Sequence, residues 1–147
     1  MSEDVTELER YLKYHFKDKG KLKRALTRMA YAKEEADQGR QCEHQDALCV
    51  LGDSVLDAIV TSALLEKGLK ERGVVTEKRK DYVKGETLRK RALDLGLHRF
   101  VRTNRSEEER REQPRVLAET LEAVIGAIYL DAGYEEASRI VRLLFDV

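Results

Sequence analysis

Apolar side chains recur at helical spacing from about Gln45 to Leu69, and this pattern constrains the fold more than any other feature of the sequence. Intervals of three and four residues place such side chains on one side of an α-helix. A long helix with an apolar side must pack against other elements. The segment therefore predicts the central helix of a helical domain. The repeated positions are Leu48, Leu51, Val55, Ile59, Leu64 and Leu65.

The other apolar patterns predict further helices, and none has the alternation typical of a strand. Polar segments over Lys33–Glu43 and Thr103–Gln113 predict loops. Because the chain has one proline and many good helix formers, we expect a single all-α domain of about seven helices over residues 1–147. The other expected elements are a helix carrying Val5 to Phe16, a second from Lys21 to Ala32, a fourth that starts at Thr76 after Gly73 ends the third, a turn around Gly96, a helix from Pro114 to Asp131 and a last helix from Tyr134 to Phe145.

The charges balance, with 28 Lys and Arg residues and 28 Asp and Glu residues, so net charge neither demands nor excludes a nucleic-acid partner. Ten of the basic residues crowd the segment from Lys67 to Arg91, although an ordinary solvated helix surface would look the same. Cys42 and Cys49 do not predict a disulfide framework, and we find no apolar leader and no membrane-length apolar run. We therefore expect a cytoplasmic protein without a membrane partner.

Acidic side chains follow one face of the central helix. Asp46, Cys49 and Asp53 are spaced three and four residues apart, and Glu119 and Glu122 are three apart on a later helix. Carboxylates crowded on partly apolar helices repel one another and are costly to remove from water. A hard cation such as Mg²⁺ would relieve both effects, because it takes oxygen ligands. Solvation or pairing with Lys and Arg would also relieve them, and this alternative stays open.

Two glycines lie inside these strongly periodic helices. Gly52 precedes Asp53, and Gly126 follows Glu122 by four residues. A glycine in a helix costs about 1 kcal/mol relative to alanine. A crossing that needs close approach of two helix backbones would account for both glycines. Such a crossing would bring Asp53 next to Glu119 and Glu122.

The same segments resemble the signatures of the ribonuclease III family. His44–Leu56 (H-Q-D-A-L-C-V-L-G-D-S-V-L) is similar to the family's N-E-R-L-E-F-L-G-D-[AS]-V-L, and Leu117–Gly133 is similar to L-A-D-x-x-E-A-x-I-G-A-[IV]-Y-L-D-x-G. Shorter likenesses at Phe16–Thr27 and Thr76–Leu88 extend the resemblance over nearly the whole chain in the family's order. It implies the all-helical fold of a ribonuclease III endonuclease domain.

The chain departs from the family pattern at five positions. Asp46 replaces the first Glu of the signature, and Cys49 replaces the second, which is a metal ligand in the family. A thiol is a poor ligand for Mg²⁺. Val50 replaces the Phe that docks into the partner subunit, Arg72 replaces the Glu before the loop glycine, and Glu119 replaces a metal-binding Asp.

What the resemblance implies is a metal-dependent endoribonuclease that hydrolyses double-stranded RNA to 5′-phosphate and 3′-hydroxyl ends. Asp53 and Glu122 would be catalytic and would hold the principal Mg²⁺ ion, for which Mn²⁺ could substitute. Glu119 would assist as a metal ligand directly or through water, while Asp46 and Cys49 would lie in the outer shell or contact RNA. Because water can replace a lost carboxylate ligand, we expect Cys49 to weaken metal affinity without abolishing activity.

A homodimer and an RNA partner are also implied. Lys78, Arg79 and Lys84 are expected to contact double-stranded or structured RNA, which proteins recognise mainly by shape and phosphates. We expect no separate double-stranded RNA-binding domain, since the helical domain continues to Val147. RNA binding should then be weak and sensitive to salt, and could need a partner protein. Val50 weakens the dimer expectation, because it buries less area than Phe.

Two alternatives differ in class. A ribonuclease III fold with an eroded site could serve as a non-catalytic RNA-binding or ribosome-associated structural protein, which the Cys49 substitution favours and the retained carboxylates oppose. Cys42, His44 and Cys49 could instead belong to a zinc site, although their spacing matches no strong zinc pattern and no fourth ligand is evident.

Overall fold

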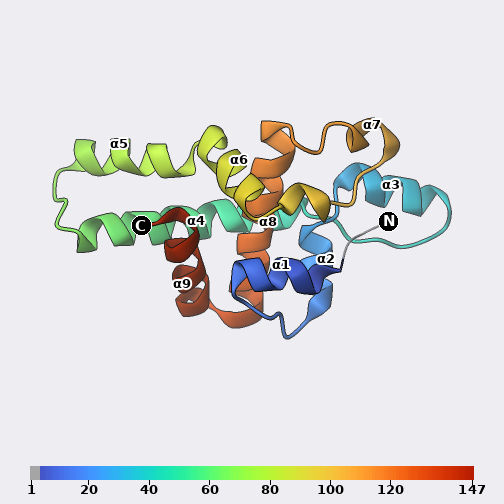
Figure 1. The fold of residues 1–147 in the computed structure, drawn as a ribbon, viewed down its shortest axis with the longest axis horizontal. Coiled ribbons are helices and arrows are strands. Elements are labelled where there is room, and N and C mark those ends of the chain that lie inside the picture. Colours follow the sequence, from blue (N-terminus) through green and yellow to red (C-terminus); the bar gives the residue numbers. More distant parts are fainter. Residues whose placement is uncertain (1–3) are drawn as a thin grey trace.

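The computed structural model describes residues 4–147, and its centre is the crossing of two long helices, α4 (Asp46–Glu66) and α8 (Pro114–Ala132). In Figure 1, α8 runs across α4 near the middle of the molecule. Both helices bury apolar side chains in one core, so the predicted central helix is confirmed, although it ends at Glu66. Fully or nearly fully buried members of this core include Leu48, Leu56, Ile59, Leu117, Leu121 and Ile125.

Shorter helices surround the crossing, and residues 4–147 contain no β-strand, so the all-α prediction is confirmed. Nine α-helices lie in the described part of the chain, and eight of them have seven residues or more. In Figure 1, α5 lies beside α4, and the two extend to one side of the molecule. The remaining bounds are α1 (Val5–Leu12), α2 (Lys19–Ala25), α3 (Met29–Asp37), α5 (Arg72–Val83), α6 (Gly85–Asp94), the 3₁₀ helix η1 (Leu97–Arg99), α7 (Arg105–Glu108) and α9 (Tyr134–Phe145).

The two central helices touch through their backbones. A methyl group on Gly52 would lie 1.7 Å from the carbonyl oxygen of Glu122, and one on Gly126 would lie 2.5 Å from the carbonyl oxygen of Leu48. Both distances are far inside van der Waals contact. The close crossing predicted from the two glycines is therefore confirmed, and it sets Gly52, the neighbour of Asp53, directly against Glu122.

The predicted helix over Lys21–Ala32 is wrong, because the chain leaves the helical path between α2 and α3. There the backbone pairs with a distant segment. The Arg102 N–H donates to the oxygen of Leu26 at 2.7 Å, and the Arg28 N–H donates to the oxygen of Arg102 at 3.0 Å. These bonds replace the helical bonds that the break removes.

Other boundaries also differ from the predictions. α5 begins one residue before Gly73, so Gly73 does not end the preceding helix and Thr76 lies inside α5 rather than capping it. The preceding helix is instead followed by Gly68, whose φ of 94° is favourable for glycine alone. Lys84 is extended, with ψ of 152°, and divides the expected fourth helix into α5 and α6.

Three further segments differ from the predictions. The helix expected to carry Val5 to Phe16 ends at Leu12, after which Lys13 adopts a left-handed conformation with φ of 59°. α3 extends into the first predicted loop, and α7 lies within the second. Both loops nevertheless contain long non-helical stretches.

A buried carboxylate near the end of α8 holds the connection between α1 and α2. Asp131 accepts a hydrogen bond from the hydroxyl of Tyr14 and bonds from the N–H groups of Lys17 (2.7 Å) and Asp18 (3.0 Å). Burial favours the neutral acid, but these bonds outweigh it and lower the pKa of Asp131. The carboxylate is therefore charged at neutral pH and fastens this connection to the core.

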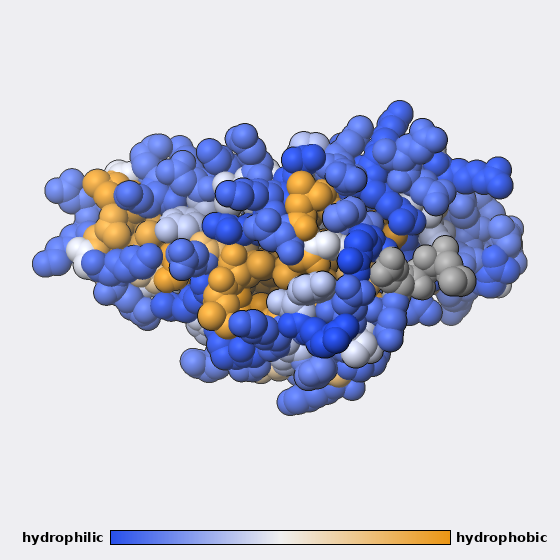
Figure 2. Space-filling model, viewed as in Figure 1, coloured by the Kyte–Doolittle hydropathy of each residue, from blue (hydrophilic) through white to orange (hydrophobic). Residues whose placement is uncertain are grey.

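By length and composition alone, α4 could cross a membrane, which corrects the expectation that the chain has no membrane-length apolar run. In the structure, however, 44% of its most apolar window is buried inside the protein, where α4 packs against α5, α8 and α9. Figure 2 shows a mostly hydrophilic face, with apolar surface where α4 and α5 lie side by side and near the centre. These contacts make α4 the core helix of the domain.

Candidate carboxylate site at the helix crossing

The carboxyl groups of Asp53 and Glu122 lie close together beside the helix crossing. Burial of Glu122 is the main cause that raises its pKa to about 8, followed by the hydrogen bond and the negative charge of Asp53. Glu119 and Asp57 add to this effect. The raised pKa of Glu122 therefore favours its protonated form at neutral pH.

Glu119 belongs to a different cluster. Its carboxylate accepts a hydrogen bond from Arg28 at 2.8 Å and lies 3.6 Å from the Nε of Arg115. The structure thus brings Asp53 and Glu122 together but directs the charge of Glu119 towards two arginines.

Arg28 organises this second cluster and was missed by the sequence analysis. Only 13% of its side chain is exposed, and its guanidinium also bonds to Gln45 at 2.9 Å and to Glu107 at 3.1 Å. The partners lie 17, 79 and 91 residues away in sequence. No local pattern could therefore have identified Arg28 as a residue of the site.

Cys49 contacts the backbone of α8 rather than offering a charged ligand. Its thiol donates a hydrogen bond to the carbonyl oxygen of Glu119 at 3.1 Å. Burial, with the negative charges of Glu119, Glu122 and Asp46, raises the pKa of Cys49 to about 12. The thiol is therefore neutral at physiological pH, which is unfavourable for metal binding.

The two remaining acidic residues of the α4 face have basic neighbours. Asp46 is exposed in the first turn of α4, 3.8 Å from the Nδ1 of His44. Asp57 forms an ion pair with Arg79 of α5 at 3.2 Å. The alternative that these carboxylates pair with basic groups therefore holds for Asp57 and Glu119, whereas Asp53 and Glu122 form no ion pair with any residue of the described range 4–147.

The Asp53–Glu122 pair has the chemistry that a hard divalent cation requires. It offers carboxylate oxygens from two helices, and a cation would replace the proton that the pair otherwise holds. Within residues 4–147, no group of three or more His, Cys, Asp or Glu side chains is arranged to hold a metal ion. A cation at this site would therefore have two protein carboxylates and would keep several water ligands.

The zinc alternative has no such cluster to support it within the described residues. The Sγ of Cys42 lies against the carbonyl oxygen of Glu43, whereas that of Cys49 bonds to Glu119. Both cysteines are free thiols.

The predicted RNA-contacting residues lie on α5 and at its junction with α6. Lys78 and Lys84 are exposed, while Arg79 is partly committed to Asp57. No residue of α5 is buried, so its basic side chains are available to a large partner. Because Asp57 lies one turn after Asp53, the Arg79–Asp57 pair connects this basic surface to the carboxylate site.

Known proteins resemble the chain in sequence. Residues 18–146 match the family model described as Ribonuclease-III-like. Ribonuclease 3 of Bdellovibrio bacteriovorus is 36% identical over 141 residues, which cover 94% of this chain and 59% of that protein. Ribonuclease 3 of Thermobifida fusca is 42% identical over 129 residues, which cover 85% of this chain and 52% of that protein. The chain thus spans somewhat more than half the length of these curated relatives.

Two solved structures of the nuclease domain of ribonuclease III from Campylobacter jejuni resemble it in fold. One, in which a region involved in dimer formation shows structural flexibility, has a TM-score of 0.88 and 34% identity, covering 97% of this chain and 96% of that one. The other, a crystal structure at 2.2 Å resolution, has a TM-score of 0.85 and 32% identity, covering 98% and 95%. The likeness therefore extends over nearly the full length of each nuclease domain.

Proposed function

The chain belongs to the ribonuclease III family, and on that basis we propose that it is a metal-dependent endoribonuclease that cleaves double-stranded RNA. Hydrolysis would leave 5′-phosphate and 3′-hydroxyl ends. The observation that carries the proposal is the Asp53–Glu122 pair, in which acidic side chains from two helices meet at the crossing of the two core helices.

Asp53 and Glu122 would hold Mg²⁺, with Mn²⁺ as a possible substitute. When bound, such an ion lowers the pKa of a bound water and stabilises negative charge at the reacting phosphate. Glu122 would then be ionised, since a nearby cation opposes the effect of burial on its pKa. Asp53 is exposed and would remain accessible to the RNA backbone.

Glu119 would act through water, because Arg28 and Arg115 already hold its carboxylate. Cys49 would contribute no charge, and Asp46 would contact RNA or bound water from the start of α4. We therefore propose a site of weaker metal affinity than one with four carboxylates, with water in the missing places.

The duplex would contact the exposed basic side chains of α5, including Lys78, Arg79 and Lys84. The phosphates of the duplex would bind these side chains. Because the Arg79–Asp57 ion pair borders the carboxylate site, a duplex on α5 would also lie close to that site. Such contacts depend on charge and shape and should weaken steeply with salt.

We also propose a homodimer in a cytoplasmic location. Val50 stands at the position of the Phe that docks into the partner subunit in the family pattern, and it is 71% exposed on α4. The related Campylobacter jejuni nuclease domain has a region involved in dimer formation. Sedimentation equilibrium of wild-type protein and of Val50→Asp tests the dimer, since a charge at the interface should favour the monomer.

A cleavage assay on a plain RNA duplex tests the proposed activity. Purified protein should cut the duplex with Mg²⁺ or Mn²⁺ and not with EDTA, giving 5′-phosphate ends. Glu122→Gln should reduce the rate about 100-fold or more while the protein stays folded, as its circular dichroism spectrum would show. Glu135→Gln, at an exposed position of α9, is the matched control and should cleave normally.

Failure of folded wild-type protein to cleave with either metal would favour the second candidate, a non-catalytic RNA-binding or ribosome-associated protein. The neutral thiol of Cys49 and the Glu119–Arg28 pair are the two features that favour it. Salt-dependent duplex binding without cleavage would be its signature.

A further inference from the structure

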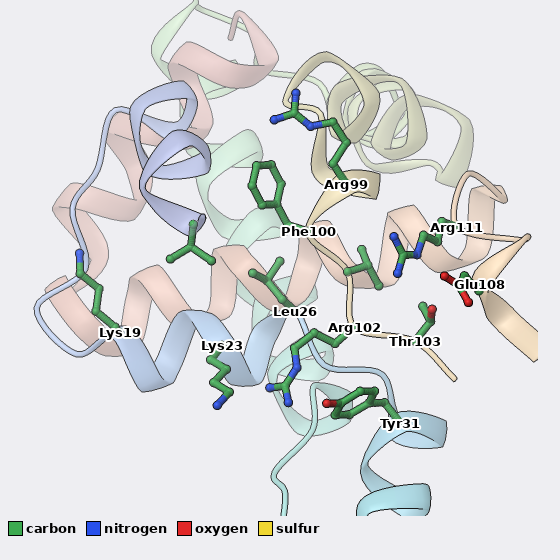
Figure 3. Close-up of a pocket in the computed structure, with 12 residues that line it drawn as sticks. Lys19, Lys23, Leu26, Tyr31, Arg99, Phe100, Arg102, Thr103, Glu108 and Arg111 are labelled. Carbon is green, nitrogen blue, oxygen red and sulfur yellow. The ribbon is translucent and has the colours of Figure 1, made fainter. Parts of the chain in front are cut away.

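Away from the carboxylate pair, a pocket of about 510 Å³ opens between α1, α2, α3 and the segment that follows η1. Figure 3 shows apolar side chains in its middle and basic side chains around them. The volume is within the range of small-molecule sites. Its apolar lining includes Leu26, Phe100 and Val101, and its cations are Lys19, Lys23, Arg99, Arg102 and Arg111.

Part of this positive charge is not neutralised by the protein. Within residues 4–147, Lys23, Arg102 and Arg111 form no ion pair, although the nearby charge of Glu35 acts on Arg102, and Glu108 is the one acidic residue that lines this pocket. The Nε of Arg111 and the Oγ1 of Thr103 are buried without a hydrogen-bond partner among the described residues. The pocket therefore retains charge and hydrogen-bonding capacity suited to an anion.

Planar groups stand beside the cations. The guanidinium of Arg102 lies over the ring of Tyr31 at 4.4 Å from its centroid, and that of Arg99 lies 5.1 Å from the centroid of Phe100. In Figure 3, Arg102 and Tyr31 lie against each other at one end of the pocket and Arg99 and Phe100 at the other. Phe100 is buried, whereas Tyr31 with Arg102 presents a partly exposed flat surface of the kind on which aromatic bases stack.

A second pocket, also of about 510 Å³, adjoins the first. Lys23 and Arg102 line both pockets, whereas Arg24 and Arg40 of the second pocket form ion pairs with Glu43 and Glu35, which also line it. A phosphate group could bind both cations at the boundary between the two pockets. The nucleoside would then lie in one pocket, and any group attached to the other side of the phosphate would lie in the second.

We propose that these adjoining pockets bind a nucleoside phosphate, with the phosphate against Lys23 and Arg102 and the base beside Tyr31. A free nucleotide and an unpaired nucleotide of an RNA strand share this chemistry. The bases of an intact duplex are stacked and paired. A duplex bound to α5 would therefore not place its bases in the pockets.

The pockets are separate from the Asp53–Glu122 pair. Leu26 lines the first pocket, whereas Arg28, two residues later, turns to Glu119. Binding can thus be measured in EDTA, without cleavage and without a loaded metal site. A failure of this proposal and a failure of the proposed nuclease activity are therefore distinguishable.

Calorimetry on the full chain in EDTA tests the proposal with four probes: AMP, a 5′-phosphorylated single-stranded tetranucleotide of RNA, adenosine and inorganic phosphate. AMP or the tetranucleotide should bind at least tenfold more tightly than adenosine and phosphate. Equal affinity for AMP and the tetranucleotide would support the proposal with a free nucleotide as ligand. Affinity at least tenfold higher for the tetranucleotide would support it with an unpaired strand as ligand.

Lys23→Glu and Lys33→Glu form a matched pair of variants, because both lysines are exposed and only Lys23 lines the pockets. Lys23→Glu should weaken binding of the favoured probe at least tenfold, and Lys33→Glu less than twofold. Tyr31→Leu should weaken nucleotide binding while leaving phosphate binding unchanged. The proposal is overturned by absence of binding, by phosphate binding as tightly as AMP, or by equal losses in the two lysine variants.

Discussion

The thiol of Cys49 donates to the main-chain carbonyl of Glu119, so the position that carries a metal-binding Glu in the family pattern touches the backbone of α8. Asp53 lies one turn further along α4, and Glu122 lies one turn further along α8. Position 49 therefore borders the carboxylate pair on both helices. Cys49→Glu restores a carboxylate at this position, so the effect of a negative charge there on metal binding can be measured.

Cys49→Glu should lower the Mg²⁺ concentration needed for half-maximal cleavage, by roughly threefold to tenfold, because it adds an oxygen ligand beside Asp53 and Glu122. A magnesium titration of the initial rate measures it. Cys49→Ala is the control, since it also removes the hydrogen bond to Glu119 but adds no charge. An unchanged magnesium requirement in Cys49→Glu would contradict the prediction.

Stability without divalent cations should fall as pH rises. The raised pKa of Glu122, about 8, means that between pH 4.5 and pH 8 the folded protein holds a proton that the unfolded chain has released. Linkage over this range corresponds to roughly 4 kcal/mol, which solvent screening of the partly exposed pair reduces to about 2 kcal/mol lost by wild-type protein in EDTA between pH 5 and pH 9. Urea denaturation across that range measures the loss.

Two comparisons isolate the contribution of Glu122. Glu122→Gln cannot ionise, so it should gain stability relative to wild type as pH rises, whereas Glu135→Gln should keep a constant difference. Added Mg²⁺ should restore wild-type stability above pH 8, because it binds the folded state. A difference between wild type and Glu122→Gln that does not change with pH would exclude the shared proton.

Gly52→Ala should destabilise the protein by about 2–4 kcal/mol, despite the better helix propensity of alanine. The added methyl group would lie 1.7 Å from the Glu122 oxygen, so the two helices would have to separate. Gly73→Ala is the control, because no atom lies within 4 Å of the added group in α5. It should stabilise by about 0.5 kcal/mol. Thermal unfolding of both variants provides the measurement, and a neutral Gly52→Ala would disprove the backbone contact.

Asp131→Asn should cost about 2–3 kcal/mol at pH 7, since the charged carboxylate accepts bonds from Tyr14, Lys17 and Asp18. The lowered pKa of Asp131 fixes the sign: its stabilising effect is present above the ordinary value of 3.8 and is lost as pH falls through the folded value. The difference from wild type should therefore shrink in acid. Denaturation at pH 7 and pH 3 measures the difference, and Asp37→Asn, at an exposed position, is the control. A stability difference between Asp131→Asn and wild type that is equal at both pH values would contradict the prediction.

The central crossing and the carboxylate pair could be predicted because their signals are local. Gly52 and Gly126 each stand in a strongly periodic helix where glycine has an energetic cost, and each flanks a carboxylate by a fixed number of residues. Because both segments are helical, the sequence spacing between each glycine and its carboxylate determines where Asp53 and Glu122 lie relative to the crossing. The roles of these carboxylates in catalysis remain predictions.

The break at Leu26–Arg28 could not be predicted in this way. The apolar spacing of Leu22, Leu26 and Met29 continues through it as if the helix did, while the backbone bonds that stabilise the break come from Arg102. The Arg28 cluster and the basic pockets have the same difficulty, because each is assembled from segments that meet only after folding. Periodicity carries no information about such distant partners.

The contact between Gly52 and the Glu122 backbone makes the spacing of the site a property of the main chain. A larger residue at position 52 or 126 would push the two helices apart directly. Substitutions at Cys49 and Glu119 leave both glycines in place, so they change the charge beside the carboxylate pair while the backbone contact remains. The crossing thus sets the smallest separation that α4 and α8 can have.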